Sequence, residues 1–171
     1  MSGNISGQPI ASRDRGPGLP AMFDRYKSRV EQELSRSVRL PEGTDPYTLI
    51  RYHLGWADQR GVTARSAISQ GKAMRPTLCL FACEALAEDP DKALPAAAAL
   101  ELIHNFSLIH DDIQDQDVER RHQPTVWSIW GVPKALVAGD AMQSVGDVCL
   151  LNTSRYGVPP QTILRISNIL T

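Results

Sequence analysis

The chain has 171 residues, of which 42% are hydrophobic and 22% charged, and its formal net charge is -1. This is the composition of an ordinary globular domain with enough apolar residues to bury a core. Basic and acidic residues are interspersed, which argues against binding to nucleic acid or to an anionic membrane surface. No apolar run approaches the roughly 20 residues needed to span a bilayer. We therefore expect no nucleic-acid partner and no membrane span, and any bound anion must be held by local groups.

Cysteine use points to a reducing compartment. Cys79, Cys83 and Cys149 are an odd number and too sparse for a disulfide scaffold, so we expect a cytoplasmic protein. Cys79 and Cys83 are four residues apart and could share a metal, but no second pair of soft ligands lies nearby. Buried thiols are the favoured interpretation. The N-terminus has no apolar stretch of the kind found in secretory signals.

The N-terminal third predicts a tail followed by helices. Residues 1–18 are rich in Ser, Gly, Pro and Arg and predict a disordered tail, with one helical domain over residues 19–171. Apolar residues at helical spacing predict a first helix from about 20 to 38. Asp45 and Pro46 begin a second helix that fades before Gly61. Pro76 begins a third helix, whose body LCLFACEALA is apolar on nearly every side.

The longest predicted helix runs from about Leu94 to about Gln116. Its body, AAAALELIHNFSLI, is apolar almost all round, which is typical of a central, buried helix. A loop through residues 120–124, a short helical piece at 125–130 and a helix from 133 to about 151 follow. Pro159 and Pro160 begin a last helix. Since no stretch alternates with period two and no repeat is present, the chain predicts an all-α helical bundle.

Three aspartates lie at the end of the predicted central helix. Asp111 and Asp115 are four residues apart and share a helix face, with Asp112 beside them. Like charges this close repel unless a cation neutralises them, and carboxylates with room for water suit Mg²⁺, which commonly bridges to phosphates. The alternative is a solvated acidic helix end, although acid at a helix C-terminus has the wrong sign for the helix dipole.

Basic residues accompany this acidic cluster. Lys72 and Arg75 lie around a helix start, where the dipole and free N–H groups favour an anion. Arg120 and Arg121 follow the aspartates, and guanidinium groups bind phosphate in bidentate fashion. His104 lies two helical turns before Asp111. Each has an ordinary alternative as a surface charge, an ion-pair partner or a core histidine, but together they indicate two diphosphate sites.

The chain resembles the trans-polyprenyl diphosphate synthases, including farnesyl and geranylgeranyl diphosphate synthases, over about residues 20–150. The motifs that carry the resemblance are Gly71-Lys72-x-x-Arg75-Pro76, Glu101-Leu102-Ile103-His104-x-x-Ser107-Leu108-Ile109-His110-Asp111-Asp112-x-x-Asp115, Arg120-Arg121-x-x-Pro124-Thr125 and Gly139-Asp140. The resemblance implies an all-α prenyl synthase fold around a deep cavity. It also implies a homodimer, or pairing with another synthase chain.

The resemblance also implies the chemistry and the site residues. Asp111, Asp112 and Asp115 would be catalytic, with Asp111 and Asp115 binding Mg²⁺ that holds an allylic prenyl diphosphate and Asp112 supporting them. Arg120 would contact that diphosphate. Isopentenyl diphosphate would be bound by Gly71, Lys72, Arg75, His104 and Arg121. Ionisation of the allylic substrate and alkylation of isopentenyl diphosphate would follow.

Two departures from the family pattern qualify the expectation. Family members often have Gly-Gly-Lys-Arg-x-Arg-Pro where this chain has Gln70-Gly71-Lys72-Ala73-Met74-Arg75-Pro76. They also run to about twice this length and carry a second aspartate-rich motif that is not in these 171 residues. We therefore expect the N-terminal portion of such an enzyme. Bulky Phe106, five residues before Asp111, with Ser107 next to it, favours a short to medium product of farnesyl or geranylgeranyl type.

Two other functions remain open from the sequence. One is a non-catalytic subunit that pairs with another synthase chain. The other is a class I terpene cyclase, which also ionises a diphosphate at an aspartate-rich motif. A cyclase has no need for a second diphosphate, so Lys72, Arg75 and Arg121 favour the synthase.

Overall fold

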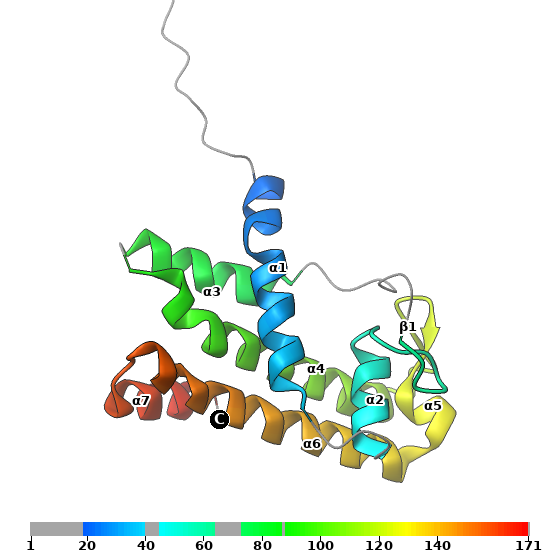
Figure 1. Ribbon diagram of the computed structural model, residues 1–171. Coiled ribbons are helices and arrows are strands. Elements are labelled where there is room, and N and C mark those ends of the chain that lie inside the picture. Colours follow the sequence, from blue (N-terminus) through cyan, green and yellow to red (C-terminus); the bar gives the residue numbers. More distant parts are fainter. Residues whose placement is uncertain (1–18, 40–44, 64–72, 87, 171) are drawn as a thin grey trace, which may run out of the picture.

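The computed structural model describes residues 19–39, 45–63, 73–86 and 88–170, with the backbone alone for 19–23. Its helices are α1 (Leu19–Ser37), α2 (Asp45–His53), α3 (Met74–Ala85), α4 (Leu94–Gln114), α5 (Val126–Trp130), α6 (Val132–Leu151) and α7 (Pro160–Leu170). Two 3₁₀ turns, η1 (Pro90–Ala93) and η2 (Asn152–Tyr156), and two short strands, β1 (Glu119–Arg120) and β2 (Gln123–Pro124), complete it. The predicted all-α bundle is confirmed (Figure 1). The predicted tail, together with Gly71 and Lys72, lies outside the described residues.

Helices α4 and α6 form the centre of the molecule and lie side by side (Figure 1). Small residues are buried on both helices: Ala97, Ala98 and Ala99 on α4 are fully buried, as are Ala135 and Ala138 on α6. Interiors pack to the density of organic crystals, so helices with small facing side chains can approach each other closely. Among the described helices none is long and apolar enough to cross a membrane.

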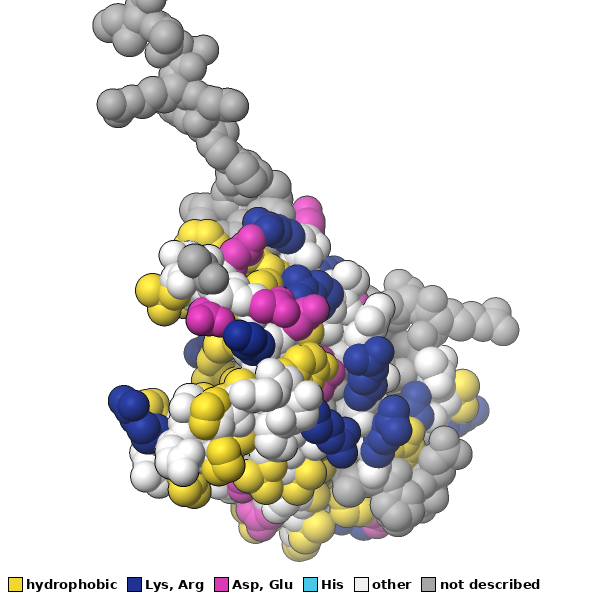
Figure 2. Space-filling view, turned by 60° about the vertical axis from the view of Figure 1, so that its left-hand side comes forward, with side chains coloured by type: hydrophobic (Ala, Val, Ile, Leu, Met, Phe, Trp, Pro, Cys, Tyr) yellow, Lys and Arg dark blue, Asp and Glu magenta, His cyan; other side chains and the backbone are white. Residues whose placement is uncertain are grey.

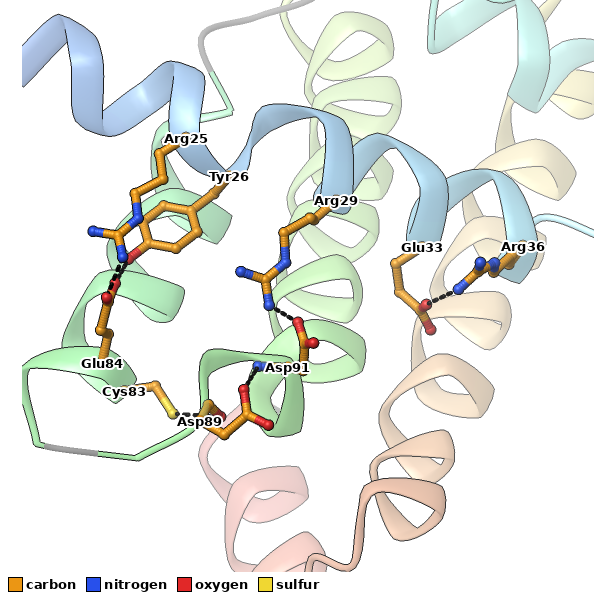
Figure 3. A network of polar contacts seen from close by, with 9 residues as sticks. All are labelled: Arg25, Tyr26, Arg29, Glu33, Arg36, Cys83, Glu84, Asp89 and Asp91. Carbon is orange, nitrogen blue, oxygen red and sulfur yellow. Dashed lines mark hydrogen bonds and ion pairs between the residues drawn. The ribbon is translucent and has the colours of Figure 1, made fainter.

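Helix α1 is fastened across the bundle by apolar and polar contacts. Tyr26 and Val30 of α1 are almost fully buried, and the Tyr26 hydroxyl donates a hydrogen bond to Glu84 on α3. Arg25 pairs with the same carboxylate, and Arg29 pairs with Asp91 in η1 (Figure 3). The hydrogen bond from Tyr26, together with the arginines, holds the pKa of Glu84 below its usual value. These contacts fix α1 against α3, the helix that carries Arg75.

Helix boundaries differ from the predicted ones where turn chemistry intervenes. Helix α3 begins at Met74, two residues before Pro76, after Ala73 with the left-handed φ of 43°. Helix α2 ends at His53, before Gly61 as predicted, and the chain then turns back and pairs Ala57 with Thr63 in an isolated bridge. Helix α4 ends at Gln114 rather than Gln116.

The segment predicted as a loop at residues 120–124 is a two-stranded antiparallel hairpin. Arg120 pairs with Gln123, and the two residues between them, Arg121 and His122, have φ of 54° and 63°. Two left-handed residues in a two-residue hairpin turn are the signature of a type I′ turn, which usually contains Asn-Gly. The Arg-His pair carries no such signal, so the sequence alone predicts a loop there.

The end of α4 is closed by a left-handed residue, Gln116, with φ of 58°. The Asp117 N–H donates to the Asp112 carbonyl at 3.0 Å and the Gln116 N–H to the Ile113 carbonyl at 3.4 Å, a Schellman arrangement. Glycine is usual at this position because a Cβ is strained there. The cap turns the chain just beyond the three aspartates.

Replacing Gln116 with glycine is therefore expected to stabilise the protein by up to about 1 kcal/mol, since relief of left-handed strain exceeds the added entropy of the unfolded chain. Urea-induced unfolding of both proteins measures the difference. The matched control is Gln114→Gly, at an exposed and helical position two residues earlier. It should cost about 1 kcal/mol instead. Destabilisation by both glycines would contradict the assigned cap.

Candidate functional site

The three aspartates at the end of α4 have different environments. Asp111 and Asp115 are exposed, and the Asp115 N–H donates to the Asp111 carbonyl at 2.8 Å, so the two side chains leave the same face of the last helical turn. Within the described residues, no hydrogen bond or ion pair holds either carboxylate. Asp112, in contrast, is only 1% exposed. The motif thus presents two free carboxylates and one that is built into the fold.

Asp112 forms a largely buried ion pair with Arg120 of β1. The Arg120 Nε–H donates to Asp112 Oδ1 at 2.7 Å. Burial raises the pKa of Asp112, and the hydrogen bond and charge of Arg120 work in the opposite direction. Among the described residues the guanidinium hydrogen-bonds only through Nε, and its two terminal nitrogens carry N–H donors that suit another anion. The pair therefore orients an arginine beside the free carboxylates.

The hairpin that carries Arg120 is anchored from three sides. The Thr125 hydroxyl and the Trp127 indole N–H both donate to the Asp117 carbonyl at 2.8 Å. The Tyr52 hydroxyl of α2 donates to the Pro124 carbonyl, also at 2.8 Å. Because α2, α5 and the end of α4 all hold the short hairpin, Arg120 and Arg121 are placed by rigid elements rather than by a free loop.

The charges of three arginines act on His104, on the partly open face of α4. Burial lowers the pKa of His104, and the positive charges of Arg75, Arg121 and Arg120 lower it further, while Glu101 acts in the opposite direction. Burial and these charges therefore favour the neutral form of the imidazole. The structure thus brings Arg75 of α3 and the two hairpin arginines into the electrostatic neighbourhood of one residue, as an anion site requires.

The central helix is less buried than its composition predicts. Leu100, His104, Ser107 and Leu108 are only half-buried, and they lie on the helix face that leads to Asp111. An apolar sequence can reflect a surface that a substrate or another part of the protein covers, and composition does not distinguish this from packing within the bundle. This partly open face carries two leucines together with the polar His104 and Ser107, and it ends at the aspartates.

His110 couples the aspartate-bearing turn to α6. Its Nε2 lies 3.3 Å from the Leu136 carbonyl and 3.7 Å from an Asp140 carboxylate oxygen, and Phe106 packs against its ring in a T-shaped contact at 4.9 Å. A Cβ at Gly139 would lie 2.3 Å from His110 Nε2. Gly139 is therefore needed to admit the histidine ring.

The sequence gives no indication that His53 lies near the site. His53, at the end of α2, has its pKa lowered to about 3, first by burial and then by the charges of Arg121 and Arg120. It lines a small cavity together with Asp112 and Arg120. The sequence offered no signal for it, since a lone histidine on an amphipathic helix is ordinarily a packing residue.

The donors fit a magnesium ion that completes its shell with other ligands. No group of three or more His, Cys, Asp or Glu side chains close enough to hold a metal occurs in the described part of the chain. Mg²⁺ is commonly bound by one or two carboxylates, with waters and phosphate oxygens in the remaining positions. Asp111 and Asp115 meet that requirement in number and kind.

The comparison with known families agrees with this site. Residues 61–169 match the family model described as Polyprenyl synthetase. The chain belongs to the polyprenyl synthetase family. Over 116 residues it is 47% identical to the (2E,6E)-farnesyl diphosphate synthase of Mycobacterium tuberculosis, a match that covers 67% of this chain and 32% of that protein. The geranylgeranyl diphosphate synthase of the same organism is 47% identical over 119 residues, covering 70% of this chain and 33% of that one.

Solved structures of the family have the same fold over the matched part. The polyprenyl synthetase of Streptomyces coelicolor superposes with a TM-score of 0.75 at 34% identity, covering 89% of this chain and 44% of that one. The geranylgeranyl pyrophosphate synthetase of Pyrococcus horikoshii gives a TM-score of 0.73 at 30% identity, covering 90% and 43%. The chain spans about a third of the length of the curated relatives, and it corresponds to their N-terminal portion.

Proposed function

We propose that this chain carries the first half of a magnesium-dependent site that condenses an allylic prenyl diphosphate with isopentenyl diphosphate. The observation that carries the proposal is the difference in burial and pairing among the three aspartates. Asp111 and Asp115 are exposed and uncommitted, whereas Asp112 is buried and holds Arg120 beside them. Membership of the polyprenyl synthetase family supports the reaction class.

The allylic diphosphate would be held at the end of α4. Asp111 and Asp115 would bind Mg²⁺, which as a Lewis acid assists departure of the diphosphate. Arg120, oriented by Asp112, would direct its terminal N–H groups to the same diphosphate. Half-buried Leu108, about one helical turn before Asp111, would help to exclude water from the allylic cation.

Isopentenyl diphosphate would be bound by the second group of cations. Arg75 and Arg121 would contact its oxygens, and neutral His104 would donate or accept a hydrogen bond. Gly71 and Lys72 belong to this proposal from the sequence motif alone. The double bond of this substrate would attack the allylic carbon as diphosphate leaves, and a proton would then be lost to restore the alkene.

Further parts of the proposal come from the sequence analysis. We keep a short to medium product, of farnesyl or geranylgeranyl type, as the expectation that rests on bulky Phe106, whose ring packs against His110. A homodimer and a cytoplasmic location remain proposals. The free thiols of Cys79, Cys83 and Cys149 are consistent with the latter.

Titration of the chain with inorganic diphosphate tests the metal clamp. Binding is expected only with Mg²⁺, and the double change Asp111→Asn, Asp115→Asn should weaken it by about 100-fold or more, since each lost charge-assisted contact contributes about 1.5–3 kcal/mol. The control is Asp117→Asn, an exposed acid two residues beyond Asp115, which should change the affinity less than about threefold. Equal weakening by the control would overturn the assignment.

The alternative of a non-catalytic partner subunit is favoured by one surface. Met74, Leu78 and Phe81 form a stripe on α3 whose side chains are 49%, 51% and 45% exposed. Figure 2 shows apolar side chains exposed at several places on one face of the molecule. Such a stripe is normally covered. Co-purification with a full-length synthase and an altered product length on mixing would support this function.

A terpene cyclase is separated from a synthase by the second substrate. Arg75 and Arg121 beside His104 favour the synthase, because a cyclase binds a single diphosphate. Product analysis with an allylic diphosphate, with and without isopentenyl diphosphate, distinguishes the two functions. Cyclic hydrocarbon formed without isopentenyl diphosphate would reject the proposed reaction.

A further inference from the structure

A small, partly open cavity lies between α2, the end of α4 and the hairpin. Asp112, Arg120 and His53 are among its lining residues. Its volume is about 30 Å³, which is enough for one water molecule. The cavity thus touches both members of the Asp112–Arg120 pair and one residue that the proposed reaction does not use.

Two polar atoms of the lining residues have no partner among the described residues: Asp112 Oδ2 and His53 Nε2. Asp112 uses only Oδ1 for Arg120. A buried polar atom without a hydrogen bond costs about 1–3 kcal/mol, so native structures rarely leave such atoms without a partner. Tyr52 and Thr125, which also line the cavity, direct their hydroxyls to the carbonyls of Pro124 and Asp117.

His53 is suited to a fixed, uncharged role. Burial and the charges of Arg121 and Arg120 lower its pKa to about 3, so it is neutral at physiological pH, and a side-chain hydrogen bond with Asn105 of α4 acts in the opposite direction. A neutral imidazole has one nitrogen that donates and one that accepts. In either tautomer Nε2 can share a hydrogen bond with water, and the same water can donate to a carboxylate.

We propose that His53 is a positioning residue, which holds Asp112 through one bridging water between His53 Nε2 and Asp112 Oδ2 and thereby fixes the direction of the Arg120 guanidinium. The cation that faces the diphosphate is then held by a chain of three groups, His53, water and Asp112. This role rests on the proposed function for its purpose, but the chain of contacts is a property of the folded protein without substrate or metal.

The first test is crystallography of the chain at a resolution that shows ordered water. Density for a water within hydrogen-bond distance of both His53 Nε2 and Asp112 Oδ2 is expected. A cavity without such density, or a direct contact between the two side chains, would overturn the proposal. This measurement needs no variant and is independent of any activity.

The second test measures the Arg120 Nε–H by ¹⁵N NMR in the absence of substrate and metal. His53→Phe fills the same space without a polar atom, and it should speed exchange of this proton with solvent about fivefold to tenfold, since a hydrogen bond contributes about 1 kcal/mol. His53→Gln offers a polar group at similar reach and should restore slow exchange. If the His53→Phe variant does not fold, two measurements decide whether His53 positions Asp112. They are the exchange rate of the Arg120 proton in His53→Gln relative to wild type, and the crystal structure.

The outcomes separate His53 from the proposed reaction. Unchanged exchange in His53→Phe, or equally fast exchange in His53→Gln, would reject the positioning role even if the protein binds diphosphate. Faster exchange with rescue by glutamine would support the role even if wild type fails to bind inorganic diphosphate with Mg²⁺, an outcome that would reject only the proposed function. A purely structural histidine would lower the melting temperature without changing the Arg120 proton selectively.

Discussion

Replacing Asp112 with alanine is expected to lower the free energy of unfolding by about 2–4 kcal/mol, whereas the same change at Asp111 leaves it within about 0.5 kcal/mol. Asp112 is buried and its Oδ1 accepts the hydrogen bond from Arg120, so its removal leaves a largely buried guanidinium without its counter-charge. Asp111 is exposed, and no hydrogen bond or ion pair within the described residues involves its carboxylate. Two adjacent residues of one motif thus make very different contributions to the stability of the fold.

Thermal unfolding monitored by circular dichroism measures this contrast. For a chain of this size the loss at Asp112 corresponds to a fall in melting temperature of about 5–15 °C. Asp112→Asn keeps the volume and one acceptor for Arg120 and should fall between wild type and alanine. Equal melting temperatures for Asp111→Ala and Asp112→Ala would mean that the Asp112–Arg120 pair does not stabilise the fold.

Replacing Gly139 with alanine is expected to destabilise the protein by about 2 kcal/mol, although alanine is the better helix former by about 1 kcal/mol. The new Cβ would lie 2.3 Å from His110 Nε2 and 2.6 Å from its Cδ2. The ring cannot simply swing away, because Phe106 packs against it and the Leu136 carbonyl lies at 3.3 Å from its Nε2. The strain therefore reaches the residue next to Asp111.

Gly146, two turns further along α6, provides the matched control. A Cβ there would meet Ile103 Cγ1 at 3.2 Å, a contact that a shift of a few tenths of an ångström relieves. Gly146→Ala should therefore be within about 1 kcal/mol of wild type in urea unfolding. The double change Gly139→Ala, His110→Ala should regain part of the lost stability. No recovery in the double variant would show that the clash lies elsewhere.

The part of the site that depends only on sequence spacing, the pair of aspartates, was predictable from the sequence. Asp111 and Asp115 share a helix face in any helix, so their separation by four residues was sufficient to place them together. The positions of Arg75, Arg121 and His104 near one another depend on how α3, α4 and the hairpin pack. The order of the motifs supported only the expectation that these residues share an anion site. The structure shows that the arginine charges act on His104.

The sequence by itself determined the all-α class, the central helix and the paired carboxylates, because helical periodicity and i, i+4 spacing are local properties. The tertiary structure alone decided which aspartate is free and which is buried with Arg120. It also decided the hairpin that turns at Arg121 and the open face of α4. The cavity lined by His53 and Asp112 is likewise a feature that only the tertiary structure decided. Burial and pairing depend on residues distant in the chain, so the environment of a charge follows from packing and not from its neighbours in sequence.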